Sequence, residues 1–163
     1  MLDALKLGWA DVERMSYVVA KKSLEFNPDA IVGISRGGFI PAVLISDELN
    51  VHDVYAVNVK YYEGFGKTKR TPELLQRLDS DYLEGRRVLL VDDLIDKGHS
   101  MKTAFEAVQE ASPKEVRTAT LFYKPPSPAP DYYAEKTNQW VVFPWEKRES
   151  LEWFKETEQT TQP

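Results

Sequence analysis

Three aspartates near the middle of the chain follow an apolar segment at a spacing that suits sugar-phosphate chemistry. The apolar run 88–91 leads directly into Asp92 and Asp93, and Asp96 follows three residues later. Gly98 comes next and precedes a helical pattern. Carboxylates accept hydrogen bonds from the hydroxyls of a ribose and bind hard metal ions, and the backbone N–H groups of a turn that opens a helix bind phosphate. The segment therefore predicts a ribose phosphate site, with Asp96 between the sugar and phosphate groups.

Two other interpretations of these carboxylates remain. Acidic residues after a strand are often only solvated turn residues, although this explanation suits one aspartate better than three at this spacing. Receiver domains hold Mg²⁺ in an acidic pocket, but that pattern requires an acidic pair after the first strand. The pair here lies past the middle of the chain, which favours the sugar-phosphate interpretation.

A glycine-rich turn earlier in the chain is the second candidate site. Ser35, Arg36, Gly37 and Gly38 come directly after the apolar run 30–34. Glycine allows the backbone to approach an anion closely, and Arg36 supplies positive charge. By itself such a turn is equally compatible with a tight strand-to-helix connection, so its interpretation depends on the acidic segment.

Two further groups of residues could contact a ligand. The stretch 63–70 predicts an exposed, mobile loop with three basic residues, which are Lys67, Lys69 and Arg70. Lys124 ends a predicted strand, and Trp140 begins an apolar segment. Each of these features also has an ordinary explanation: a solvated basic loop, a solvent-facing lysine and a core tryptophan.

The elements that would carry these residues alternate between helices and strands. Apolar residues at helical spacing predict an amphipathic helix within the first 25 residues. Further patterns predict strands over 30–34, 53–62, 87–91, 115–123 and 139–143, and helices over 41–49 and 100–111. This order predicts an α/β fold, with a parallel sheet of about five strands and helices on both faces. Ligands bind beyond the carboxyl ends of such strands, where the segments 35–39, 92–100 and 124–130 leave the sheet.

Composition narrows the choice of cofactor and partner. The 163 residues suit one domain over 1–163, and the chain has no cysteine and two histidines, which argues against a zinc site. A metal would therefore be a hard cation held by oxygen, which points to Mg²⁺. The net charge of −5 does not favour nucleic-acid binding. The sequence lacks a signal peptide and any apolar run of about 18 residues, so we expect a cytoplasmic protein without a membrane partner.

The acidic segment resembles the signature with which type I phosphoribosyltransferases bind phosphoribosyl pyrophosphate (PRPP). In that signature a hydrophobic strand is followed by Asp-Asp, two residues, Asp-Thr-Gly, one residue and Thr. The chain departs from it at Lys97 and at Ser100, both of which stand where the family usually has threonine. Ser100 keeps the hydroxyl, whereas Lys97 replaces it with a positive charge near the expected 5-phosphate.

The resemblance assigns roles to the residues of both motifs. It implies that the PRPP ribose and phosphate are bound by Asp92, Asp93, Asp96, Lys97, Gly98, His99 and Ser100, and pyrophosphate by Ser35, Arg36, Gly37, Gly38 and Arg70. Asp93 is the expected contact for Mg²⁺. Asp96 is the expected catalytic residue, which accepts or relays the proton at the five-membered ring of a purine.

The C-terminal third resembles the 6-oxopurine branch of the family, in particular the xanthine-guanine type. In that branch a Lys-Pro pair contacts the 6-oxo group, which matches Lys124, because an ammonium group only donates hydrogen bonds. Trp140 would stack on the base and Val141 would contact it through its backbone. About residues 124–146 and the N-terminal segment would form a small base-binding hood, while Trp145 and the charged segment after it are interpreted as structural.

The resemblance, which runs from about residue 9 to about 146, implies a purine phosphoribosyltransferase. Such an enzyme converts PRPP and guanine, hypoxanthine or xanthine to a nucleoside monophosphate and pyrophosphate. A homodimer or homotetramer is expected. Two alternatives stay open, namely a phosphoribosyltransferase for another base and a regulator on the same fold that senses PRPP or nucleotide without turnover.

Overall fold

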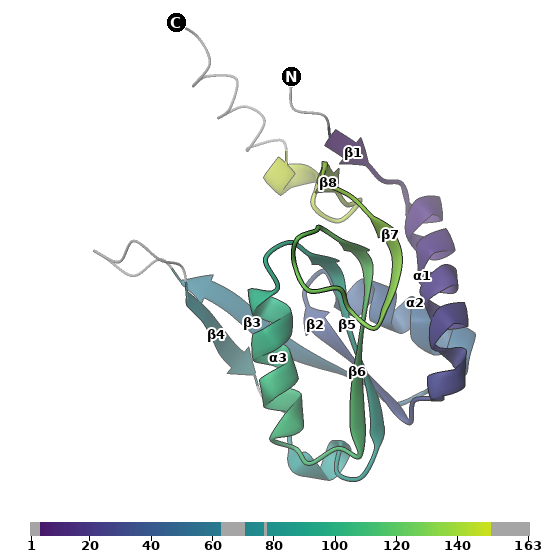
Figure 1. The fold of residues 1–163 in the computed structure, drawn as a ribbon, viewed down its shortest axis with the longest axis vertical. Helices are drawn as coiled ribbons and strands as arrows, with labels where there is room; N and C mark the ends of the chain where they lie inside the picture. Colours follow the sequence, from purple (N-terminus) through teal and green to yellow (C-terminus); the bar gives the residue numbers. More distant parts are fainter. Residues whose placement is uncertain (1–3, 63–70, 77, 151–163) are drawn as a thin grey trace, which may run out of the picture.

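The computed structural model describes residues 4–62, 71–76 and 78–150, and its centre is a six-stranded sheet of order β4-β3-β2-β5-β6-β7 (Figure 1). The strands are β2 (Ala30–Ser35), β3 (Val54–Tyr62), β4 (Thr71–Gln76), β5 (Arg87–Ile95), β6 (Glu115–Tyr123) and β7 (Tyr132–Lys136). All neighbouring strands pair in parallel except β4, which is antiparallel to β3. The parallel strands bring their carboxyl ends to one edge of the sheet.

Helices cover both faces of this sheet, as the sequence predicts. The helices are α1 (Trp9–Ser23), α2 (Phe39–Leu49) and α3 (His99–Gln109), with short 3₁₀ turns at η1 (Leu24–Phe26) and η2 (Ser80–Tyr82). Leu89 and Val91 of β5 belong to the core beneath α1 and α2, whereas Val88 and Leu90 belong to the core beneath α3. Because alternate residues of a strand point to opposite faces, a continuous apolar run fills both cores.

A separate two-stranded sheet lies above the main sheet in Figure 1. It pairs β1 (Ala4–Lys6) with β8 (Trp140–Val142) in parallel, so that Leu5 lies opposite Val141. The N-terminal segment and the segment after β7 therefore meet in space, although more than a hundred residues separate them. The longest helix in the described part of the chain has 15 residues, too few to cross a bilayer.

The structure confirms the predicted α/β class and corrects three of the predicted elements. The strand predicted at 139–143 exists but pairs with β1, so it is not part of the main sheet. The helix predicted for the first 25 residues begins only at Trp9, because Leu5 lies in β1 and Gly8 caps the helix with its N–H bonded to Asp11 Oδ2 at 2.9 Å. β5 continues to Ile95, so the first two aspartates of the acidic segment lie inside the strand.

The two outer strands of the main sheet were not predicted. β4 contains a proline, and β7 consists of partly buried and exposed residues with two charges. Edge strands have one neighbour and tolerate such residues. Their sequences therefore lack the apolar pattern that marks the central strands.

Candidate active site

The glycine turn and the acidic segment are in direct contact. β2 and β5 are neighbours, so the turn after β2 lies against the end of β5. A Cβ atom on Gly38 would lie 2.7 Å from the Asp92 Cα, and one on Gly37 would lie 1.9 Å from Asp93 Oδ2. No other residue type fits there without a shift, because real Cβ atoms do not approach so closely. The structure thus brings the two predicted motifs into one site.

Of the two adjacent aspartates of this site, Asp92 is buried and Asp93 is half-buried. Asp92 is only 8% exposed, and its Oδ1 accepts a hydrogen bond of 2.9 Å from the Asp93 N–H. Burial raises the pKa of Asp92 well above its ordinary value, and the charge of Asp93 adds to that rise. Burial also raises the pKa of Asp93. Such a pair gains stability from a nearby cation, because positive charge offsets both the burial and the mutual repulsion.

Trp145 also belongs to this site, although its sequence position predicted only a structural role. Its ring stacks on Phe143 at a centroid distance of 4.7 Å and an interplanar angle of 10°. Its buried indole N–H makes no hydrogen bond of normal geometry with any described residue. The N–H nevertheless lies close enough to the Asp93 carboxyl to oppose the rise in its pKa. The aromatic residues after β8 thereby support the carboxylate pair.

Two glutamates after Trp145 were likewise not predicted as site residues. Burial, followed by the charges of Asp93 and Glu149, raises the pKa of Glu146 to about 7. Glu149 forms an ion pair with Arg36 of the glycine turn, and both side chains are largely exposed. Because these residues lie more than forty positions after the acidic segment, no local pattern could have linked them to it.

The raised pKa of Glu146 predicts a pH dependence of stability. The folded protein keeps this proton up to about pH 7, whereas the unfolded chain loses it near the ordinary value of 4.5. The folded state therefore binds more protons in this window, and stability falls as the pH rises through it. Glu146→Gln should weaken this dependence and, after a discount for partial exposure, stabilise the protein at about pH 8 by about 1 kcal/mol, or about 2–4 °C in Tm.

Thermal unfolding at several pH values between about 5 and 8 measures this effect. Glu84→Gln is the matched control, since Glu84 is exposed and precedes the start of β5, whereas the carboxylate pair lies near the end of that strand. Equal slopes of Tm against pH in the wild type and Glu146→Gln would contradict the prediction.

A second cluster joins the acidic segment to the end of β6. Lys124 Nζ lies 3.9 Å from Asp96 Oδ1 and 5.7 Å from the centre of the Trp140 ring. The Lys124 side chain is 15% exposed, whereas Trp140 keeps 39% of its surface exposed. Val141 is buried behind it. A lysine, a carboxylate and an accessible aromatic face thus converge from three separate elements.

The turn that opens α3 has the geometry expected of a phosphate-binding turn. Gly98 is its N-cap with φ of +82°, a conformation that favours glycine. The first backbone N–H groups of a helix have no partner within the helix, and helix N-termini of this kind bind anions. Lys97 and His99 are exposed beside them, and Ser100 is half-buried. A cavity of about 420 Å³ adjoins the turn and extends to Phe105 and Pro128.

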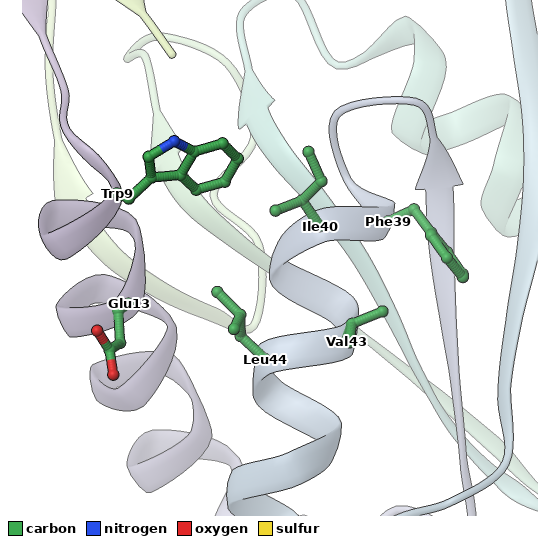
Figure 2. Close-up of a pocket in the computed structure, with 6 residues that line it drawn as sticks. All are labelled: Trp9, Glu13, Phe39, Ile40, Val43 and Leu44. Carbon is green, nitrogen blue, oxygen red and sulfur yellow. The ribbon is translucent and has the colours of Figure 1, made fainter. Parts of the chain in front are cut away.

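Another cavity of about 420 Å³ lies between α1 and α2, away from these polar residues (Figure 2). Its lining is apolar apart from one carboxylate, and consists of Trp9, Glu13, Phe39, Ile40, Val43 and Leu44. In Figure 2 Glu13 points away from Ile40 and Leu44. The cavity offers no charge partner for a phosphate, so it is not the candidate site.

Comparison with known proteins accounts for this arrangement. A model of the phosphoribosyl transferase domain matches residues 1–149. The chain belongs to this family. The match covers the glycine turn, the acidic segment and the lysine–tryptophan cluster, and it confirms the resemblance to type I phosphoribosyltransferases.

Individual phosphoribosyltransferases are similar over most of the chain. Xanthine-guanine phosphoribosyltransferase of Ruegeria sp. (strain TM1040) is 34% identical over 152 residues, covering 86% of this chain and 84% of the relative. A purine phosphoribosyltransferase from Pyrococcus horikoshii Ot3 is similar in structure, with a TM-score of 0.81 and 36% identity over 88% of this chain and 95% of that one. A Neisseria gonorrhoeae protein solved with bound ppGpp has a TM-score of 0.81 and 25% identity, covering 93% of this chain and 94% of that one.

One predicted pyrophosphate contact of the family cannot be placed. Arg70, with Lys67 and Lys69, lies outside the described residues. The other predicted site residues divide between the carboxylate site at the glycine turn, the turn that opens α3 and the lysine–tryptophan cluster. Asp96 links the last two, because it precedes the α3 turn and contacts Lys124.

Proposed function

We propose that this phosphoribosyltransferase transfers the phosphoribosyl group of PRPP to a 6-oxopurine, giving a nucleoside monophosphate and pyrophosphate. The convergence of Asp96, Lys124 and Trp140 beside the acidic segment carries this proposal. The similar proteins support this proposal, since they are named as xanthine-guanine and purine phosphoribosyltransferases. The ppGpp-bound Neisseria protein adds that a chain of this fold accommodates a guanine nucleotide.

The glycine turn and the carboxyls of Asp92 and Asp93 would hold PRPP at its pyrophosphate and ribose. Asp92 and Asp93 accept hydrogen bonds from the ribose hydroxyls. The backbone of the glycine turn and Arg36 bind pyrophosphate, for which Arg36 exchanges its ion pair with Glu149. The backbone of the α3 turn, together with Lys97, His99 and Ser100, binds the 5-phosphate. With these contacts the anomeric carbon would lie at the carboxyl end of β5.

The lysine–tryptophan cluster would bind the purine. The Lys124 ammonium donates a hydrogen bond to the 6-oxo group. An amino group at position 6 is itself a donor, so it cannot accept this hydrogen bond. Trp140 stacks on the ring and Val141 contacts its edge through the backbone. The small β1–β8 sheet then acts as the base-binding hood. As the bond from the anomeric carbon to pyrophosphate breaks and the bond to the purine nitrogen forms, Asp96 takes the proton from the five-membered ring.

The adjacent carboxylates of Asp92 and Asp93 have donor chemistry that fits Mg²⁺, with Asp93 as its proposed contact. Two adjacent carboxyls with raised pKa values are stabilised by a hard cation that prefers oxygen ligands. The described residues contain no group of three or more metal-ligating side chains, so substrate oxygens and water would complete its shell. When bound, Mg²⁺ would supply positive charge to the departing pyrophosphate.

A spectrophotometric assay with PRPP and Mg²⁺ against guanine, hypoxanthine, xanthine and adenine tests the proposal. Turnover of at least one oxopurine but not adenine is the expected result. Lys124→Gln should lower kcat/KM for oxopurines by about 10–100-fold, because it removes a charged hydrogen bond worth about 1.5–3 kcal/mol. Lys114→Gln is the matched control, since this exposed lysine precedes the opposite end of β6. Equal activity of the two variants would contradict the proposed role of Lys124 in binding the base.

The remaining alternatives predict different outcomes of the same assay. Turnover of adenine or a pyrimidine alone would indicate another base. No turnover, combined with measurable binding of PRPP or nucleotide, would indicate a regulator, which should also bind nucleic acid in a salt-sensitive way. The expected homodimer or homotetramer stays a prediction.

A further inference from the structure

The loop that follows β6 is attached to the end of β5 at three points. The Lys124 N–H donates to the Ile95 carbonyl at 2.8 Å. The Lys124 ammonium lies 3.9 Å from Asp96 Oδ1. Ser127, three residues later, donates a hydrogen bond from its hydroxyl to the backbone carbonyl of Asp96. The loop therefore contacts both the side chain and the backbone of Asp96.

The sequence of this loop explains why Ser127 makes the third contact. Pro125 and Pro126 separate it from Lys124, and proline has no N–H to donate. Ser127 is thus the first residue after Lys124 that can donate a hydrogen bond. Its own N–H bonds to the Lys124 carbonyl at 3.0 Å, which closes a tight turn. The turn holds the Ser127 hydroxyl against the chain at Asp96.

Asp96 needs such support, because packing does little to hold it. Its side chain is 61% exposed, and it comes immediately after the last residue of β5. A group that receives a proton must be held within hydrogen-bond reach of the reacting nitrogen, and small displacements of catalytic groups lower the rate steeply. A hydrogen bond to the Asp96 backbone fixes the point from which its side chain extends.

We propose that Ser127 is a positioning residue for the transfer reaction, which aligns the Asp96 carboxylate with a base held by Lys124. This inference rests on the proposed function. Because Ser127 and Lys124 belong to the same turn, a purine that orders Lys124 also orders Ser127 and hence the Asp96 backbone. Binding of the base is thereby coupled to placement of its proton acceptor. In this role Ser127 acts through Asp96 and not directly on PRPP or the base.

Ser127→Ala and Ser127→Thr test this role together. We expect Ser127→Ala to lower kcat by about tenfold, the value of one hydrogen bond of about 1.4 kcal/mol, while KM for PRPP stays within about twofold. Ser127→Thr keeps a hydroxyl and should restore most of kcat. Ser46→Ala is the matched control, because the Ser46 hydroxyl also donates to a backbone carbonyl, that of Val43 at 2.7 Å, but lies in α2. It should leave kcat unchanged.

Hydrogen exchange gives a second readout that does not require turnover. Peptides spanning 94–100 should exchange about tenfold faster in Ser127→Ala than in the wild type or Ser46→Ala, as the loss of one such hydrogen bond predicts. Unchanged kcat in Ser127→Ala, or failure of Ser127→Thr to restore it, would overturn the inference. If the wild type turns over no base, the proposed function fails. In that case the hydrogen exchange still tests the positioning role, and equal exchange over 94–100 in Ser127→Ala and the wild type would overturn it.

Discussion

Asp96→Asn is expected to lower kcat by about 10²–10⁴-fold, the contribution of a well-placed general acid or base. An amide has nearly the shape of a carboxylate but cannot accept the purine proton. The Asp96 side chain is 61% exposed, so the substitution leaves the core undisturbed and should not change Tm appreciably. Steady-state kinetics with PRPP and the preferred oxopurine, together with thermal unfolding, measure both quantities.

Asp81→Asn is the matched control for this prediction. Asp81 is an exposed aspartate of η2, which precedes the start of β5, whereas Asp96 follows the end of that strand. Wild-type kinetics in this variant would show that loss of a surface carboxylate is harmless in itself. A kcat within about twofold of wild type in Asp96→Asn would contradict its proposed role as proton acceptor. A change in KM alone would reassign it to substrate binding.

Gly38→Ala should strongly destabilise the fold. The added Cβ would lie 2.7 Å from three backbone atoms at once, namely the Asp92 Cα and the carbonyl oxygens of Ile34 and Val91. These atoms belong to the two central strands and cannot move aside as a flexible side chain would. We expect a loss of about 3 kcal/mol, at the upper end of the range for overpacking, which lowers Tm by about 6–12 °C. Thermal unfolding checks this value.

Gly8→Ala separates this clash from a general effect of alanine. Gly8 and Gly38 are the N-caps of α1 and α2, so both variants share the cost of alanine at an N-cap. The nearest atom to a Cβ on Gly8 is Asp11 Oδ2 at 3.6 Å, an ordinary contact. Gly8→Ala should therefore lose about 1 kcal/mol or less. Equal losses in the two variants would contradict the close approach of the glycine turn to β5.

The central part of the fold could be predicted from local patterns. β2, β5 and β6 are long runs of apolar or β-branched residues, and α3 shows clear helical spacing. Buried strands and amphipathic helices show these patterns because each residue's environment repeats with the period of its element. The outer strand β7 and the short β1 have too few buried side chains to show a pattern, and the proline in β4 disfavours a strand there.

Most residues of the candidate site could also be predicted from the sequence, because each of its motifs is contiguous. Asp92 to Ser100 form one segment, and Ser35 to Gly38 form another. Carboxylates, glycines and a helix N-terminus suggest their chemistry wherever they occur in this order. The same holds for Lys124 and Trp140, although the resemblance to the oxopurine enzymes was needed to connect them.

Contacts between distant segments were decided only by the tertiary structure. The order of strands places the glycine turn on Asp93, and the pairing of β1 with β8 presents Trp140 to Lys124. Trp145 and Glu146 lie near the carboxylate pair. They belong to a charged segment whose sequence gives no sign of a binding site. The local periodicity of a sequence indicates whether a residue is buried, but not which residues pack against it. Those contacts depend on packing and strand order across the whole molecule.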